Sequence, residues 1–126
     1  MDRKKLLICL SALIVFIFLV HVGASFFYWY RALGWLDIFL HFLGGIWLSL
    51  AAVWLLRIDD FGIRALFSII VFVLLFGVLW EGYELLVNSS TTRNPLDVLD
   101  TLSDLLLDLL GGGVGIFFVK NYAAKR

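Results

Sequence analysis

The sequence predicts an all-α polytopic membrane protein, an up-down bundle of four transmembrane helices with both termini in the cytoplasm. Its composition, its hydrophobic runs and its charge distribution lead to this prediction. Of its 126 residues 63% are apolar, and the mean hydropathy is +1.02. Soluble domains contain about 45–50% apolar residues, so a water-soluble fold is excluded. Ten basic residues balance ten acidic ones, which leaves no basic surface for nucleic acid.

Four apolar runs set the number of predicted helices. Each has roughly 20 residues or more, and a helix of that length crosses a hydrocarbon core of ~30 Å because each residue adds ~1.5 Å. The four spans cover residues 6–28, 35–56, 64–87 and 95–119. Together they use most of the chain, so one transmembrane domain over residues 1–126 is expected.

The first span resembles a secretory signal, because it follows the basic cluster 3–5 and residues 23–25 form a weak cleavage site. The apolar stretch continues beyond that site into the aromatic run 26–30, so we expect a retained helix. Cys9, the single cysteine of the chain, lies in this run and has no second cysteine for an intrachain disulfide. It is expected to be a small apolar side chain.

The second and third spans are defined by their short connections to their neighbours. The second span contains a pair of small residues, Gly44 and Gly45, which we expect to let helices pack closely. The third span begins at Arg64 after a charged loop. Short connections make successive helices antiparallel neighbours, which is the reason for expecting an up-down bundle.

The fourth span has the clearest start. Asn94 is a suitable N-cap, Pro95 suits the first helical position, and Asp97 stands where a capping box places its acid. Near its end, Gly111 and Gly115 form a small-residue pair four positions apart, a pattern that lets helices pack closely. We expect this pair to be the surface through which a homo-oligomer would form.

Basic residues separate the two ends of the predicted bundle. Eight of them precede the first span, join the second to the third, or follow the fourth: Arg3, Lys4, Lys5, Arg57, Arg64, Lys120, Lys125 and Arg126. The two other connections contain only Arg31 and Arg93. The positive-inside rule therefore places both termini in the cytoplasm. It predicts an integral protein of a bacterial or archaeal cytoplasmic membrane.

Nine ionisable side chains lie in or at the mouths of these apolar spans. Seven are carboxylates and two are imidazoles: His21, Asp37, His41, Glu81, Glu84, Asp97, Asp100, Asp104 and Asp108. An acid at the centre of a membrane helix costs about 2.5–3.5 kcal/mol on insertion scales, so such residues normally face a protein interior and serve a function. Asp100, Asp104 and Asp108 follow one another at intervals of four and form an acidic stripe on one helix face.

The depth of these side chains predicts that they meet. With ~1.5 Å of rise per residue, one of them from each helix lies roughly 7 Å to the outer side of the bilayer centre. These four residues are His21, His41, Glu81 and Asp104. A second layer, at roughly 12–13 Å, consists of Asp37, Glu84 and Asp100. All four helices are therefore expected to direct polar groups into one pocket on the external side.

Such a cluster needs cations or protons, because several carboxylates within a few ångströms cannot all be ionised alone. Carboxylates with imidazoles from four helices are the ligands of di-metal bundles, but Glu81 and Glu84 lack the Glu-x-x-His spacing of those proteins. We therefore expect Mg²⁺, Mn²⁺, Ca²⁺ or Zn²⁺ in preference to a di-iron centre. Glu81 and Asp104 are also the candidate catalytic carboxylates. The full set of expected ligands is His21, Asp37, His41, Glu81, Glu84, Asp100 and Asp104.

Three short motifs resemble known membrane proteins. They are Asp37-x-x-x-His41-Phe42, Trp80-Glu81-x-x-Glu84 and Asp100-Thr101-x-x-Asp104-Leu105-x-x-Asp108-x-x-Gly111. This pattern resembles the small bacterial inner-membrane families called YjdF-like and VanZ-like, and it covers the predicted second to fourth helices. These families have no settled biochemical activity, although VanZ-like members are linked to altered tolerance of glycopeptide antibiotics. The resemblance implies a joint role for these acids and His41, and it implies no reaction.

Several candidates also have a structural interpretation. His21 lies outside the resemblance, and a histidine bonded to a neighbouring carbonyl or carboxylate explains it as well as a ligand does. Asp37 is near enough to the start of its helix to cap it, and Asp97 fits a cap and a partner of the helix dipole. Asp108 fits either a partner of the ligands or an interhelical hydrogen bond.

Three functions fit this pattern. The favoured one is hydrolysis or group transfer, dependent on a metal, on a lipid or lipid-linked substrate at the outer interface. Arg31 and Arg93 at the pocket mouth would bind an anionic group of that substrate. A proton or cation transporter is an alternative, although the inner halves of the spans contain few polar residues. The second alternative is a non-catalytic accessory protein, although buried acids are a costly way to join helices.

Overall fold

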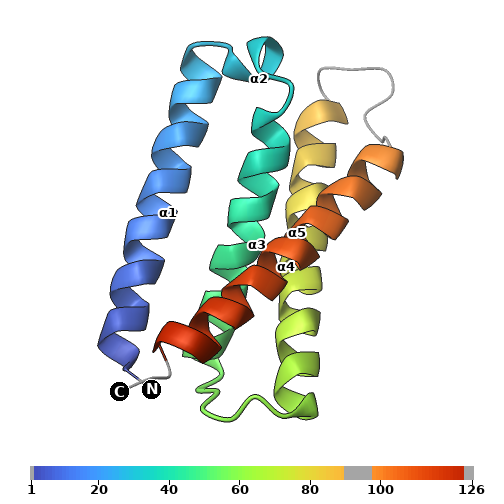
Figure 1. The fold of residues 1–126 in the computed structure, drawn as a ribbon. Helices are drawn as coiled ribbons and strands as arrows, with labels where there is room; N and C mark the ends of the chain where they lie inside the picture. Colours follow the sequence, from blue (N-terminus) through green and yellow to red (C-terminus); the bar gives the residue numbers. More distant parts are fainter. Residues whose placement is uncertain (1, 90–97, 124–126) are drawn as a thin grey trace.

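Four long helices make up most of the computed structural model, which describes residues 2–89 and 98–123. All four are long and apolar enough to cross a membrane: α1 (Arg3–Phe26), α3 (Leu36–Leu55), α4 (Ile63–Ser89) and α5 (Val98–Phe118). A short helix, α2 (Trp29–Ala32), follows α1, and a π-helical turn, η1 (Val119–Ala123), continues α5. Successive long helices alternate in direction (Figure 1). The prediction of an all-helical protein with four membrane-length helices is confirmed for the described residues.

Both ends of α1 are set by local backbone chemistry. The helix begins at Arg3 because the carboxylate of Asp2 accepts hydrogen bonds from the backbone N–H groups of Lys4 and Lys5, at 3.1 and 3.2 Å. It ends before the expected position 28, because Tyr28 adopts the left-handed conformation, with φ 58° and ψ 30°. This turn starts α2, a helix that hydrophobicity alone did not predict.

The starts of the second and fourth long helices differ from their expected positions. Trp35 is the N-cap of α3, so Asp37 lies in the first turn and does not cap the helix. The described part of α5 begins at Val98. The predicted start signals of this helix, Asn94, Pro95 and Asp97, lie outside the described residues.

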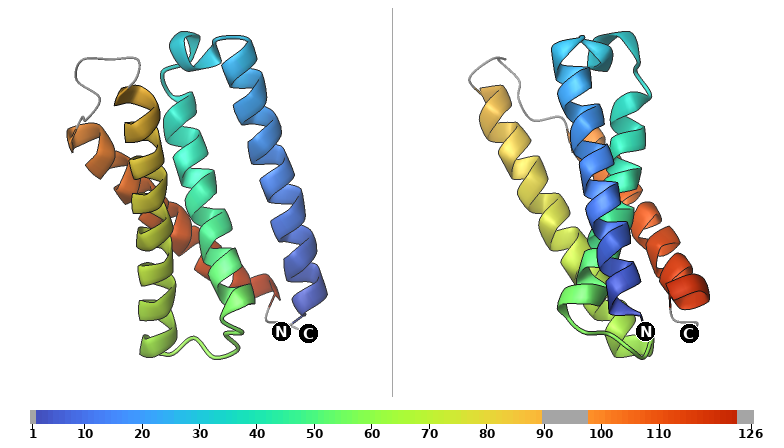
Figure 2. Two further views of the ribbon diagram at one scale, coloured as in Figure 1. Left: turned by 180° about the vertical axis from the view of Figure 1, so that it is seen from behind. Right: turned by 90° about the vertical axis from the view of Figure 1, so that its left-hand side faces the viewer.

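α3 is the central helix and contacts each of the other three long helices. α5 crosses it obliquely, α4 packs against both α3 and α5, and α1 lies on the other side of α3 (Figures 1 and 2). α1 makes no extended contact with α4 or α5. The four helices therefore do not close into a regular ring, and a space remains between α1 and α4.

Glycines let α3 and α5 approach closely. A side chain at Gly45 would meet backbone atoms of Asp108, one at Gly111 would meet a backbone carbonyl of α3, and one at Gly115 would meet a side-chain hydroxyl of α3. All three glycines are buried. Gly111 and Gly115, the pair expected to join two copies, thus form a helix contact within one chain, and homo-oligomerisation stays a prediction.

The buried apolar core comes from segments in the half of the molecule that contains both termini. Figure 1 shows where these segments and the termini lie. Its buried residues come from the first half of α1, the second half of α3, the first half of α4 and the end of the chain: Leu6, Leu10, Leu50, Val53, Ile69, Val73 and Val119. Two hydrogen bonds attach α1 to α3 here. Arg3 donates to the carbonyl oxygen of Trp54 at 2.7 Å, and the indole N–H of Trp47 donates to the carbonyl oxygen of Leu10 at 3.0 Å. The buried polar residues His41, Asp104 and Asp108 lie outside this core.

Candidate functional site

α5 places its acidic stripe beside the histidine of α3. The exposed fraction is 7% for His41, 2% for Asp104 and 4% for Asp108. His41 Nε2 lies 3.4 Å from Asp104 Oδ2 and 3.6 Å from Asp37 Oδ1, and His41 Nδ1 lies 3.4 Å from Asp108 Oδ1. The close approach of Asp108 to Gly45 fixes where these two acids of α5 lie along the axis of α3. Carboxylates from two helices therefore face both nitrogens of one buried imidazole.

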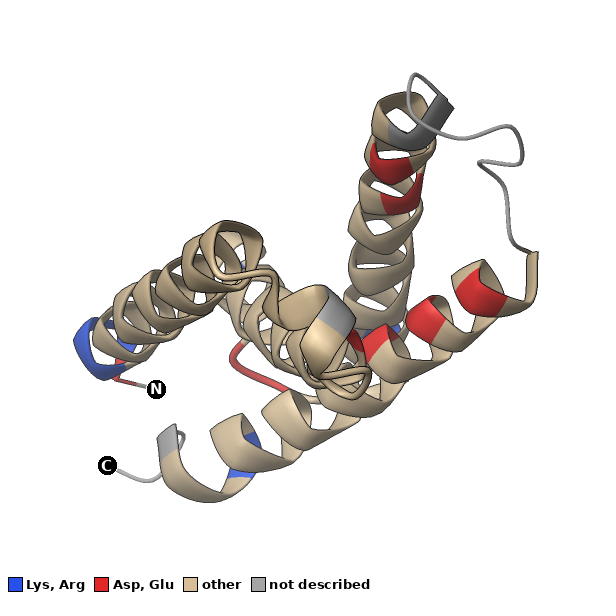
Figure 3. Ribbon diagram, turned by 90° about the horizontal axis from the view of Figure 1, so that it is seen from above, with Lys and Arg blue, Asp and Glu red and all other residues tan. Residues whose placement is uncertain are grey.

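α4 brings two glutamates to the same place. Ligand atoms of His41, Glu81, Glu84 and Asp104 all lie within 4.8 Å of one another. A second group with the same property consists of Asp37, Asp100 and Asp104. Because Asp104 belongs to both groups, they form one cluster, which we call the acidic cluster. Figure 3, seen from the end that carries α2 in Figure 1, shows the acidic segments of α4 and α5.

Two oxygen atoms of the acidic cluster are buried without a hydrogen-bond partner. They are Glu81 Oε1 and Asp104 Oδ2. Asp104 Oδ2 lies at ion-pair distance from His41 Nε2, 3.4 Å, without forming a hydrogen bond. A buried polar atom that lacks its hydrogen bond costs about 1–3 kcal/mol. A cation bound between these oxygens would remove that cost.

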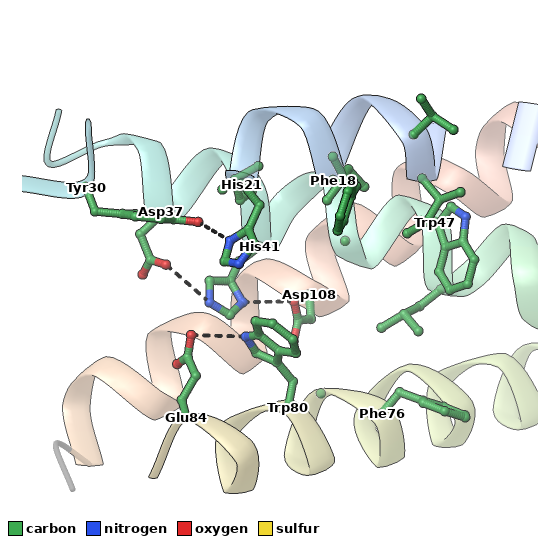
Figure 4. Close-up of a pocket in the computed structure, with 17 residues that line it drawn as sticks. Phe18, His21, Tyr30, Asp37, His41, Trp47, Phe76, Trp80, Glu84 and Asp108 are labelled. Carbon is green, nitrogen blue, oxygen red and sulfur yellow. Dashed lines mark hydrogen bonds and ion pairs between the residues drawn. The ribbon is translucent and has the colours of Figure 1, made fainter. Parts of the chain in front are cut away.

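A cavity of about 750 Å³ lies next to the acidic cluster, between α1, α3 and α4. Figure 4 shows that its two ends differ in chemistry. One end carries the polar side chains of Tyr30, His21, Asp37, His41 and Glu84. The other end is lined by Phe18, Trp47 and Phe76. The acidic cluster is thus the polar end of a mainly apolar groove.

His21 lies at the cavity but in neither group of candidate ligands. Its Nδ1 forms a hydrogen bond of 2.6 Å with the hydroxyl of Tyr30, and its ring meets that of Trp80 edge to face, with centroids 6.4 Å apart. The indole N–H of Trp80 donates in turn to Glu84 Oε1 at 3.1 Å. His21 therefore joins α1 to α2 and borders the aromatic wall of the cavity.

Tyr30 and Trp80 are site residues that sequence reasoning did not name as candidates, although Trp80 stands in one of the three motifs. The spacing of four residues between Trp80 and Glu84 was a readable signal of contact on one helix. The pairing of Tyr30 with His21 depends on the left-handed turn at Tyr28, and hydrophobicity contains no such information.

The environment of Tyr30, which lies between the first two spans, favours its neutral form. Burial, followed by the negative charges of Asp37 and Glu84, raises the pKa of Tyr30 to about 12. The phenol is therefore protonated at physiological pH, and its hydroxyl shares the hydrogen bond of 2.6 Å with His21 Nδ1. This tyrosine closes the polar end of the cavity as a neutral hydrogen-bonding group.

The remaining predicted site residues have mixed outcomes. Asp100 is exposed on α5, yet one of its oxygens belongs to the group with Asp37 and Asp104. The side chain of Arg31 and the whole of Arg93 lie outside the described residues. Binding of an anionic substrate by these two arginines stays a prediction.

Comparison with known proteins supports the membrane assignment. A family model described as "Predicted membrane protein (DUF2238)" matches residues 5–125. No curated protein and no solved structure matches the chain significantly. The matched region contains all four membrane-length helices apart from the first residues of α1. The chain therefore belongs to the DUF2238 family of predicted membrane proteins.

Proposed function

We propose that this membrane protein binds a divalent cation in the acidic cluster and uses it for hydrolysis or group transfer on a lipid or lipid-linked substrate. One observation carries the proposal: ligand atoms from three helices, on His41, Glu81, Glu84 and Asp104, lie within 4.8 Å of one another. Three carboxylates with one imidazole are an oxygen-rich ligand set that suits Mg²⁺, Mn²⁺, Ca²⁺ or Zn²⁺.

The charge of the site supports a bound cation. Asp37, Asp104 and Asp108 all face His41, and a single imidazolium cannot neutralise three carboxylates. Like charges at this spacing repel strongly in a medium of low dielectric constant. A divalent ion would neutralise the excess and coordinate Glu81 Oε1 and Asp104 Oδ2, the two buried oxygens without a hydrogen-bond partner.

Hydrolysis at this site would use the same carboxylates in two roles. A divalent cation held by these residues would make a neighbouring water molecule more acidic, which is the chemistry that the ion would supply. Glu81 or Asp104 would accept the proton of that water. The hydroxyl group would bond to the electrophilic atom of the substrate, and the accepted proton would pass to the departing oxygen. In a transfer reaction, an acceptor hydroxyl replaces the water.

The distribution of charge supports a site on the external face of a bacterial or archaeal cytoplasmic membrane. Arg3, Lys4 and Lys5 begin α1 and Lys120 follows α5, whereas the acids of α4 and α5 lie near the end of α4 and the start of α5. These two acidic segments lie at the end of the molecule opposite both termini (Figure 1). The positive-inside rule favours the basic end as cytoplasmic. The resemblance of the motifs around His41, Glu81 and Asp104 to YjdF-like and VanZ-like proteins supports a joint role for them.

The apolar core favours a one-sided site over a transport route. The core that lies beyond Asp108 is formed by aliphatic side chains such as Leu50, Val53 and Ile69. Among the described residues, Ser49 is the buried polar residue of this half. A path for protons or cations needs polar groups on both sides of the cluster, so transport is the weaker interpretation.

Metal content tests the proposal directly. Purified protein exposed to Mg²⁺, Mn²⁺, Ca²⁺ and Zn²⁺ should retain stoichiometric metal by elemental analysis, and Glu81→Gln and Asp104→Asn should each lose at least about tenfold in affinity. Asp59→Asn removes an exposed acid from the α3–α4 loop and should have no effect. Native protein without metal, or equal metal content in all variants, would refute a metal site. Cation flux in sealed vesicles that both cluster variants abolish would favour transport over hydrolysis.

A further inference from the structure

The cavity beside the acidic cluster is a groove with two separate walls. Residues Ile14 and Phe18 of α1 form one wall, and Phe76 of α4 forms the other. α3 forms the floor, where Gly44 lines the cavity and a side chain added at this position would meet no atom within 4 Å. The missing side chain at Gly44 is therefore one reason that the space is open.

Hydrogen bonds hold the wall formed by α1 in place at both ends of the groove. At the apolar end, the indole of Trp47 lines the cavity and donates to the carbonyl oxygen of Leu10. At the polar end, His21 is bonded to Tyr30. Because α1 is attached to the rest of the molecule on both sides of the groove, the opening is a built feature of the fold.

The groove lies within helices that are long and apolar enough to span a membrane, so its surroundings are lipid. An apolar cavity does not hold water well, and its volume of about 750 Å³ falls in the range of ligand-binding pockets. A hydrocarbon chain satisfies the lining between Phe18 and Phe76, and it can enter from the bilayer because α1 and α4 make no extended contact.

We infer that this groove binds the hydrocarbon chain of a phosphate-bearing amphiphile, whose phosphate reaches the acidic cluster. The chain lies on Gly44 between α1 and α4, with its polar end toward His41 and Glu84, as the two ends of the cavity in Figure 4 indicate. The inference therefore specifies a phosphate-bearing amphiphile as the substrate class of the proposed reaction.

The choice of phosphate rests on the proposed function. Carboxylates alone repel a phosphate, but a divalent cation held by one or two carboxylates commonly binds substrate phosphates as well. The choice of a hydrocarbon chain rests on the groove and is independent of the metal. The two parts can therefore be tested separately.

Native mass spectrometry tests the inference by measuring how much hexadecyl phosphate the protein retains. The sample is the full chain, loaded with metal and solubilised in detergent. The native protein should retain this probe, and Gly44→Phe should retain at least about tenfold less, the loss expected when about two methylene groups are excluded. Gly113→Phe is the matched control, because Gly113 is exposed on α5 and has no atom within 4 Å of an added Cβ. Butyl phosphate, which lacks the chain, should not displace the probe.

A second blocking variant covers the case in which Gly44→Phe fails to fold. Ile14→Trp narrows the groove from α1, where the side chain of Ile14 is 40% exposed, and should also lower retention. Metal content is measured on the same samples. Equal retention in the blocking variants and the native protein, or efficient displacement by butyl phosphate, would overturn the inference even if metal is bound. Retention that depends on Gly44 without bound metal would instead overturn the metal site and leave the chain site standing.

Discussion

Gly44 and Gly45 are neighbours in the chain, yet they serve two different regions of the molecule. Gly45 faces α5, where an added side chain would meet the backbone of Asp108. Gly44 faces the groove between α1 and α4, where an added side chain would meet nothing within 4 Å. The same residue type thus allows two backbones to touch on one side of α3 and leaves room for a ligand on the other.

The two sides of α3 show how this fold divides its tasks. The α3–α5 side is closely packed, and this contact holds Asp104 and Asp108 against His41. The α1 side is open in the middle and attached at its ends. In the proposed function, the groups that need fixed distances lie on the packed side, and the space for the substrate lies on the open side.

The largest expected effect comes from filling the packed side. In Gly45→Ala the new Cβ would lie about 2.8 Å from Asp108 Cα and closer still to its carbonyl oxygen, and backbone atoms cannot move aside cheaply. Overpacking of this kind costs about 1–3 kcal/mol, sometimes more. We expect a clear drop in the thermal unfolding temperature in detergent, followed by tryptophan fluorescence, together with weaker metal binding.

Gly44→Ala is the matched control for this comparison. It makes the same chemical change one position earlier, toward open space, and alanine is the better helix former by about 1 kcal/mol in water. Its unfolding temperature should equal or exceed that of the native protein. Equal destabilisation by the two substitutions would show that Gly44 and Gly45 do not face different regions.

The existence of the acidic cluster could be predicted from the sequence, because helix geometry fixes depth. The rise of ~1.5 Å per residue placed His41, Glu81 and Asp104 at one level, and the structure brings their ligand atoms together. Depth arithmetic also placed His21 at this level, but the structure pairs it with Tyr30 outside the two ligand groups. Depth says how high a side chain lies on its helix and not in which direction it points.

The groove could not be predicted, because it depends on how each helix is rotated about its axis. Gly44 and Gly45 were both assigned to close packing, and only the contact with α5 decides that Gly45 takes this role. Likewise, short connections predicted antiparallel neighbours but not that α1 would avoid extended contact with α4. Helix rotation is set by tertiary packing, which a hydrophobic run does not encode.

A smaller effect is expected from loosening the open side. Arg3→Ala removes the hydrogen bond of 2.7 Å to the carbonyl oxygen of Trp54 and the stacking of the guanidinium over that indole. The free energy of unfolding in bicelles should fall by about 1 kcal/mol, with metal content unchanged. Lys4→Ala removes the same charge from the exposed neighbouring position and should change stability less. A loss of metal in Arg3→Ala would contradict the separation of the two regions.

The smallest effect at neutral pH is expected at the polar end of the groove. Tyr30→Phe removes one hydrogen bond to His21, worth on average about 0.6 kcal/mol in a membrane protein. This difference in stability between the native protein and Tyr30→Phe should shrink and then change sign at high pH. The reason is that the pKa of Tyr30 in the fold, about 12, lies above its ordinary value of 10.0. The neutral phenol therefore stabilises the fold fully below pH 10, and this contribution is lost as the pH rises from 10 to 12. Stability of the native protein should fall more steeply over this interval than that of Tyr30→Phe. The control is Tyr122→Phe, which removes a 67% exposed tyrosine at the opposite end of the molecule. Its stability should depend on pH as that of the native protein does. Parallel curves of stability against pH for all three proteins would show that the closed end of the groove does not hold Tyr30 in its neutral form.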